Sequence, residues 1–273
     1  MKIRKNKIFN FIILLISILT FGCSESLVNS SWLNNEINID GYKNDWQGSL
    51  KYYDEEKVVV GIKNNGEYIY FCLATSDNNK ITKILRTGFT VWLNPQDSDG
   101  EKIGIQYPIK RDKNEPVESG DRQDKKAQPN NEKMSKMVDS FKANQNELLI
   151  VNSDNFPLNA FSNINDFGLE AKIDYNMQQL VYELKVPLST DKNSSFYIDA
   201  LPGELLEVGF ESGEFEKPSG GDRNSRSKGQ AGEMSGGGRK GGMRGKNRSS
   251  KQEMTVNMDP IEFWFDVKLA QEK

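Results

Sequence analysis

A series of short apolar segments, each bounded by Asn, Asp or Gly, most constrains the fold of this chain. Two of them, QLVYELKVPL at 179–188 and IEFWFDVKL at 261–269, place large apolar residues at every second position. Because successive side chains of a strand point to opposite faces, this alternation predicts half-buried β-strands. We expect strands near 36–40, 49–54, 57–64, 67–76, 88–94, 102–109, 147–153, 168–176, 179–189, 204–212 and 261–269.

About eleven short strands with tight turns and little helix predict an all-β protein, and we expect a β-sandwich rather than a barrel. One short helix is expected over residues 131–143. There Met134, Met137, Val138 and Phe141 recur at the i, i+3, i+4 and i+7 positions of a single apolar stripe.

Two long polar insertions interrupt the strands, a charged loop at about 110–131 and a Gly/Lys/Arg-rich arm at about 214–257. Within the arm, residues 217–251 hold ten Lys or Arg against two acids and ten of the 23 glycines, with no aromatic residue and no Ile, Leu or Val. This composition cannot build a core and predicts disorder. Its charge suits anionic polysaccharide or lipid headgroups, while a loop without a specific partner is the alternative. Because the arm lacks aromatics for base stacking, we expect no nucleic acid partner.

The N-terminus resembles a bacterial lipoprotein signal. A basic start, a short apolar run at 8–21 and a small residue before Cys23 predict a signal peptide over 1–22. Cys23 would then carry acyl chains such as palmitate and hold the protein on a membrane. We expect residues 23–34 to be a tether and 35–270 a single domain. An uncleaved anchor helix is the alternative.

Several kinds of chemistry are excluded by composition. The chain has no histidine, which rules out Ser-His-Asp catalysis, His-ligated zinc and bis-His haem. Besides Cys23 there is one cysteine, Cys72, inside an apolar strand-like run, so we expect a buried, inert thiol. We therefore expect no enzyme and assign no catalytic residue. A carboxylate-based glycosidase would need two carboxyl groups facing each other in a cleft, which a sequence cannot show.

The order of several segments resembles the family 9 carbohydrate-binding modules and the wider DOMON-like sandwiches over about residues 33–270. INIDGYKNDW at 37–46, NGEYIYFCLATSD at 65–77 and GFTVWLNP at 88–95 carry the likeness, followed by VYELKVPLS, ELLEVGFES and EFWFDVKL. The resemblance implies a jelly-roll-like sandwich of two antiparallel sheets with a non-catalytic binding role. It also implies that saccharide is held between aromatic side chains, aided by polar groups and nearby calcium.

Three tryptophans are the candidate ligand-binding residues. Trp264 alternates with charged residues, Trp92 shares a strand face with Thr90, and Trp46 follows Asp45 after a turn. Packing is the alternative for each, and it is the favoured interpretation for Trp46.

A calcium site is a weaker candidate. Asp97 and Asp99 in NPQDSDGE (94–101) begin like an oxygen-ligand loop, but the later Gly and Glu of an EF-hand are missing. A polar turn between strands is the preferred interpretation, so no metal ligand is assigned.

Together these features predict a lipid-anchored, non-catalytic β-sandwich of the cell envelope, on the outer membrane, that binds carbohydrate. The face of the membrane stays open. Two alternatives remain: a haem-binding, DOMON-like electron-transfer protein with Met or Lys ligands, and an envelope accessory protein with no small ligand.

Overall fold

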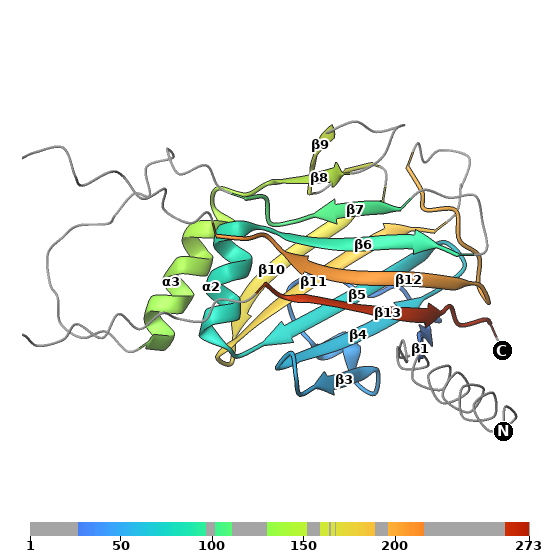
Figure 1. Cartoon of the computed structure of the whole chain (residues 1–273), viewed down its shortest axis with the longest axis horizontal. Coiled ribbons are helices and arrows are strands. Elements are labelled where there is room, and N and C mark those ends of the chain that lie inside the picture. The colour runs from blue at the N-terminus through green and yellow to red at the C-terminus, as the bar shows by residue number, and fades with distance from the viewer. Residues whose placement is uncertain are drawn as a thin grey trace, which may run out of the picture.

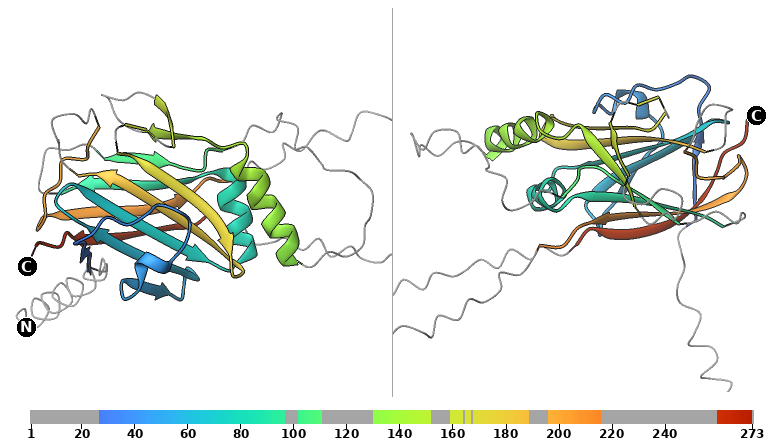
Figure 2. Two further views of the ribbon diagram at one scale, coloured as in Figure 1. Left: turned by 180° about the vertical axis from the view of Figure 1, so that it is seen from behind. Right: turned by 90° about the horizontal axis from the view of Figure 1, so that it is seen from above.

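Two stacked β-sheets form the protein, and they confirm the predicted all-β sandwich (Figure 1). The view from above separates the two layers and places both helices at one end (Figure 2). The computed structural model describes residues 27–96, 102–110, 130–151, 159–163, 165–166, 168–188, 196–215 and 260–272.

One layer is a seven-stranded sheet with the order β1-β13-β12-β6-β7-β8-β9. Its pairs are antiparallel except β1 with β13. The strands are β1 (Leu27–Asn29), β13 (Glu262–Lys268), β12 (Leu205–Ser212), β6 (Phe89–Pro95), β7 (Ile103–Gln106), β8 (Glu147–Val151) and β9 (Asn159–Ser162).

The other layer is a six-stranded sheet with the order β10-β11-β5-β4-β2, in which β3 also pairs with β4. The strands are β10 (Glu170–Asn176), β11 (Gln179–Pro187), β5 (Tyr68–Thr75), β4 (Val58–Asn64), β2 (Ser31–Trp32) and β3 (Leu50–Tyr53). The described residues thus form thirteen strands instead of about eleven. The strand expected at 36–40 is absent, and this segment is irregular.

Residues 27–32 join the two sheets, because the chain leaves the seven-stranded sheet after β1 and enters the six-stranded sheet as β2. At the crossing, the Ser30 hydroxyl donates to the Asn64 side chain and accepts from the Ala270 N–H at 2.8 Å. The domain therefore begins earlier than the tether expected at 23–34 would allow.

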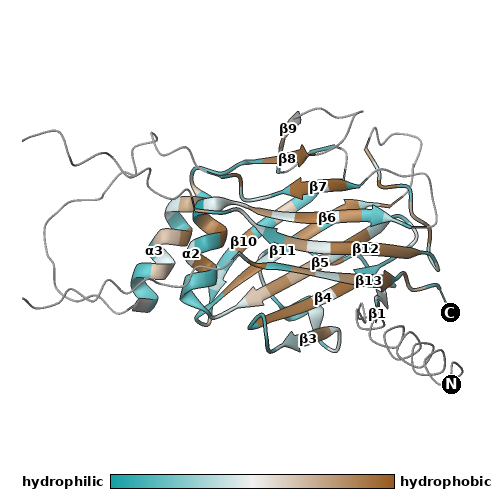
Figure 3. Cartoon of the chain, in the orientation of Figure 1, coloured by the Kyte–Doolittle hydropathy of each residue, from teal (hydrophilic) through white to brown (hydrophobic). Residues whose placement is uncertain are grey.

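The main core fills the space between the sheets and contains the inward-facing residues of both. Aromatic rings bridge the layers: Phe71 of β5 meets Phe210 of β12 edge-on at 6.1 Å, and Tyr182 of β11 meets Phe89 of β6 at 5.1 Å. Hydropathy colouring shows apolar residues along much of the strands and a mixture of apolar and polar residues on both helices (Figure 3).

Two helices close one end of the sandwich, beside each other at the left of Figure 1. The predicted helix is confirmed as α3 (Asn130–Lys142). A second helix, α2 (Asn78–Thr87), was not predicted. Its N-terminus is capped by Asp77, which accepts the N–H groups of Asn79 and Lys80. No helix in the described part of the chain has the length and hydropathy of a membrane span.

Residues 33–49 lie over the outer face of the six-stranded sheet and build a second, smaller core there. Trp46, at the end of a 3₁₀ helix (Asn44–Trp46), is 0% exposed. Its ring lies over Gly61, where an added Cβ would come within 2.8 Å of the indole. The favoured interpretation of Trp46 as a packing residue is therefore confirmed. Its candidate role as a ligand contact is wrong, because the indole is buried.

Glu183 of β11 fastens this segment to the sheet. Its carboxylate is fully buried and accepts three N–H groups, from the Trp46 indole at 2.5 Å, Gly41 at 2.5 Å and Asp40 at 2.9 Å. Burial raises the pKa of Glu183 to about 7, although the three hydrogen bonds act in the opposite direction. Cys72 is buried in the same small core, and burial raises the pKa of its thiol, as expected for an inert cysteine.

Replacing Trp46 by Phe removes a hydrogen bond to a buried carboxylate and leaves a void over Gly61. We expect the free energy of unfolding in urea to fall by about 2–4 kcal/mol. Trp32→Phe is the matched control, because Trp32 is partly exposed and no described residue accepts its indole N–H. Equal losses in the two variants would contradict the role given to Trp46.

The stability of the protein should also depend on pH through Glu183. Because the folded-state pKa of about 7 lies above the ordinary glutamate pKa of 4.5, this group contributes stability that is fully present below pH 4.5 and is lost as pH rises through 7. Urea unfolding of the wild type and Glu183→Gln, which cannot titrate, gives the measurement. As pH rises over this range, we expect the free energy of unfolding of the wild type to fall by up to about 3 kcal/mol relative to that of Glu183→Gln. Parallel pH profiles would contradict the assignment.

Candidate functional site

Trp92 and Trp264, predicted from different segments, are brought together on the outer face of the seven-stranded sheet. In the register of the sheet, Gly209 of β12 lies directly between them, and Gly104 of β7 lies on the far side of Trp92. Both tryptophans are partly exposed. Because neighbouring strands are ~4.8 Å apart, their Cα atoms are separated by about 10 Å.

The two glycines let the indole rings lie close to the sheet. A Cβ added at Gly209 would come within 2.4 Å of the Trp264 ring, and one at Gly104 within 2.8 Å of the Trp92 ring. Each ring thus lies against the backbone of a neighbouring strand. We call Trp92, Trp264, Gly104 and Gly209 the tryptophan platform.

Polar side chains flank the platform on both sides. On one side, Glu211 of β12 accepts the Trp92 indole N–H at 2.6 Å. On the other, Glu207 accepts from the Asn94 amide at 2.8 Å. Next to it, Asp266 accepts from the Gln96 amide at 2.6 Å. The platform is therefore an aromatic surface bordered by carboxylates and amides.

Lys102, just before β7, reaches over the platform. Its Nζ lies 4.0 Å from the centre of the Trp264 ring and 5.4 Å from that of Trp92. An ammonium group over an indole face is attracted by the ring's electron-rich surface. Lys102 thus places a hydrogen-bond donor above the aromatic surface.

The outer face of the seven-stranded sheet faces the viewer in Figure 1, where β6, β12 and β13 are in front and no described element lies over them. The opposite sheet differs, because residues 33–49 lie over its outer face. The two outer faces of the sandwich are thus unequal. Among the described residues no helix or strand covers the aromatic face, and the Lys102 side chain lies over its rings.

The other predicted positions fall elsewhere. Cys23, Asp97, Asp99 and most of the basic arm lie outside the described residues. Within the described ranges, no group of three or more Cys, Asp or Glu is arranged to hold a metal ion.

The described residues include three methionines that could act as haem ligands. Met134 and Met137 of α3 pack in the main core, and Met177 is 94% exposed at the hairpin between β10 and β11.

One tryptophan was missed by the sequence analysis. Trp32 of β2 lines a groove of about 780 Å³ beside the C-terminal end of β13. Its segment was taken for a tether, because Asn and Ser surround it. A large aromatic residue in such a polar stretch was the available signal.

No protein-family profile matches the chain. No curated protein matches it either. Two solved structures of a family 9 carbohydrate-binding module from Caldicellulosiruptor kristjanssonii are similar to it. The complex with glucose is 10% identical, with a TM-score of 0.34, and covers 69% of this chain and 78% of that one. The complex with cellotriose is 8% identical, with a TM-score of 0.33, and covers 68% and 76%. Values this low say nothing about the ligand of this chain.

Proposed function

We propose that this chain is a non-catalytic carbohydrate-binding protein and that the tryptophan platform is its binding surface. The observation that carries the proposal is the pair Trp92 and Trp264, laid over Gly104 and Gly209 on an open sheet face between rows of hydrogen-bonding groups.

The chemistry of a sugar fits such a surface. The C–H groups on the faces of a pyranose ring are apolar and stack on the π face of an indole, while the hydroxyl groups around its edge need hydrogen-bond partners. Glu207, Glu211 and Asp266 can accept from hydroxyl groups, and Asn94 and Lys102 can donate to them. Aromatic faces and edge partners thus occur together.

The charges around the platform favour a neutral saccharide. Among the described residues, the outer face of β12 and β13 carries four carboxylates, Glu207, Glu211, Glu262 and Asp266, against two cations, Lys268 of β13 and Lys102 just before β7. A uronic acid or sulfated sugar would meet net repulsion there. A neutral sugar can use the same carboxylates as hydrogen-bond acceptors.

The surroundings of the carboxyl groups support binding without catalysis. A glycosidase needs a proton-donating carboxyl group within a cleft. Glu183, whose pKa burial raises to about 7, has both oxygens occupied beneath Trp46 on the other sheet. Glu207 and Glu211 are four residues apart on one strand of an open face.

The proposal includes a lipid anchor at Cys23 in the outer membrane of the cell envelope, with the basic arm near anionic polysaccharide or headgroups. The described domain begins at Leu27, so a lipid on Cys23 would hold it within about 14 Å of the bilayer surface. We expect labelled palmitate to be incorporated into the wild type and lost in Cys23→Ala. Labelling that survives the substitution would contradict the anchor.

The binding proposal is tested by affinity electrophoresis of the full chain through gels containing xylan, β-1,3-glucan, mannan or hydroxyethyl cellulose. We expect at least one polymer to retard the wild type. Because stacking on either indole is lost, Trp92→Ala and Trp264→Ala should each weaken the affinity by about tenfold or more. Tyr52→Ala is the matched control, an exposed aromatic residue on the other sheet.

Gly209→Ala tests the platform without removing an aromatic ring. Its Cβ would come within 2.4 Å of Trp264, whereas a Cβ at Gly66 meets nothing within 4 Å. We expect Gly209→Ala to weaken retardation and alter the near-ultraviolet circular dichroism, and Gly66→Ala to do neither. Unretarded migration in every gel, or equal effects of Tyr52→Ala and Trp264→Ala, would refute the proposed function.

A further inference from the structure

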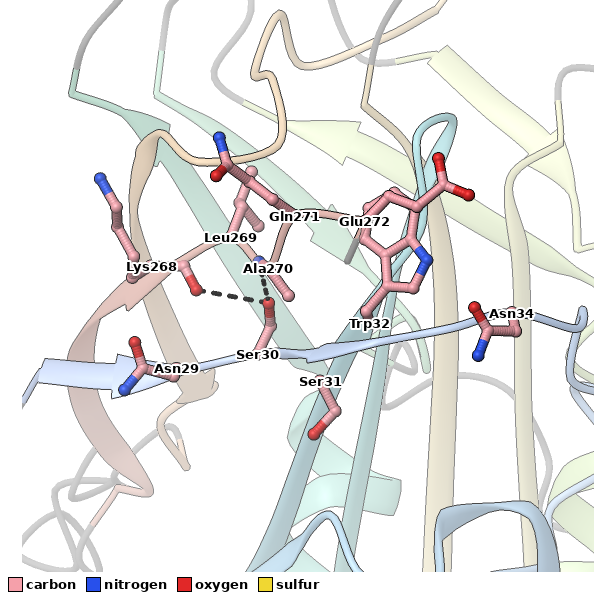
Figure 4. A pocket seen from close by; sticks show the side chains of 10 residues that line it. All are labelled: Asn29, Ser30, Ser31, Trp32, Asn34, Lys268, Leu269, Ala270, Gln271 and Glu272. Carbon is pink, nitrogen blue, oxygen red and sulfur yellow. Dashed lines mark hydrogen bonds between the residues drawn. The ribbon is translucent and has the colours of Figure 1, made fainter.

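The groove that contains Trp32 lies where residues 27–32 pass from one sheet to the other (Figure 4). Its floor is held firmly. The Ala270 N–H donates to Ser30 Oγ at 2.8 Å and to Asn64 Oδ1 at 2.9 Å, and the Asn64 amide donates back to the Ala270 carbonyl at 3.0 Å. Asn64 is fully buried. The groove is therefore a preformed feature of the sandwich.

The walls of the groove carry groups suited to a polyhydroxylated ligand. Figure 4 shows the Trp32 side chain rising from the chain on the side opposite to Ser31, and Asn34 and Glu272 also line the groove. The indole of Trp32 is partly exposed, and within the described ranges its N–H has no hydrogen-bond acceptor. Asn29, Lys268 and Gln271 complete the polar lining.

The groove is continuous with the tryptophan platform. Trp264, Asp266 and Lys268 alternate along the outer face of β13, and Lys268 also lines the groove. Next to them, β1 places Leu27 beside Asp266 and Asn29 beside Lys268. At ~3.4 Å per residue, Lys268 is about 14 Å along the strand from Trp264. One polar track thus joins two aromatic surfaces.

We propose that this track is an extended binding surface, on which a neutral oligosaccharide chain spans several units from the tryptophan platform to Trp32. This inference rests on the proposed function, because the platform supplies the first contact. The groove volume of about 780 Å³ lies in the range of ligand sites in proteins. Its ionic groups, Lys268 and Glu272, have opposite charges, which suits a ligand that has hydroxyl groups and no net charge.

An extended surface predicts that affinity depends on the length of the ligand. The experiment is calorimetric titration of the full chain with oligosaccharides, from disaccharide to hexasaccharide, of the polymer that retards it in the gels. We expect affinity to rise about tenfold or more between the shortest and the longest ligand. Trp32→Ala should abolish that rise and leave disaccharide affinity within about twofold. Trp32→Phe, which keeps an aromatic face, should restore most of it.

The outcomes separate this inference from the proposed function. If Trp264→Ala weakens every ligand while Trp32→Ala weakens only the longer ones, both are supported. If oligosaccharides bind through Trp264 but affinity is the same at all lengths, or Trp32→Ala leaves the length dependence intact, the extended surface is refuted and the platform stands.

Two further results also count against the extended surface. If Trp32→Ala lowers the urea midpoint and changes no affinity, the groove serves only to stabilise the fold. Binding to anionic phospholipid vesicles that requires Trp32, without an effect on saccharide affinity, would assign the groove to the membrane instead.

Discussion

Three N–H groups, from Trp46, Gly41 and Asp40, converge on the carboxylate of Glu183 and hold residues 33–49 against the six-stranded sheet. A buried carboxylate is costly unless its oxygens are hydrogen-bonded, so the segment and the sheet depend on each other. This arrangement also determines which sheet has an uncovered outer face. With one outer face of the sandwich covered by its own chain, the seven-stranded sheet presents the open face, and the candidate site lies there.

The aromatic character of the open face depends on the positions of two glycines. Gly209 and Gly104 occupy positions at which any side chain would lift an indole away from the sheet. Their absence of a Cβ lets Trp264 and Trp92 lie against the backbone of neighbouring strands, so each ring is supported from below. Carboxylates and amides on the adjacent rows are paired with one another and with the Trp92 indole. Such pairing orients the polar edge of the platform before any ligand arrives.

The sequence predicted the interior strands better than the edges and the helices. Strands β4, β5, β11, β12 and β13 are rich in apolar residues because they line the core, and all were expected. Strands β1 and β2 were missed, since polar residues such as Asn29 and Ser31 pair there through the backbone. Helix α2 had readable signals, with Asp77 as cap and Ile81, Ile84 and Leu85 on one face. The segment 36–40 has the apolar alternation of a strand, but the N–H of its last residue, Asp40, donates to the Glu183 carboxylate.

By itself, the sequence determined the β-sandwich, the burial of Cys72, and the absence of histidine chemistry, because periodicity and composition are local properties. It also made Trp92 and Trp264 candidate ligand-binding residues, with packing as the alternative for each. Only the tertiary structure decided that these two share a platform, that Trp46 is buried against Glu183, and that Trp32 lines a groove. Each of these depends on strand register and on contacts between residues far apart in the chain, such as Gly209 between two tryptophans more than 170 positions apart. No local pattern encodes that proximity.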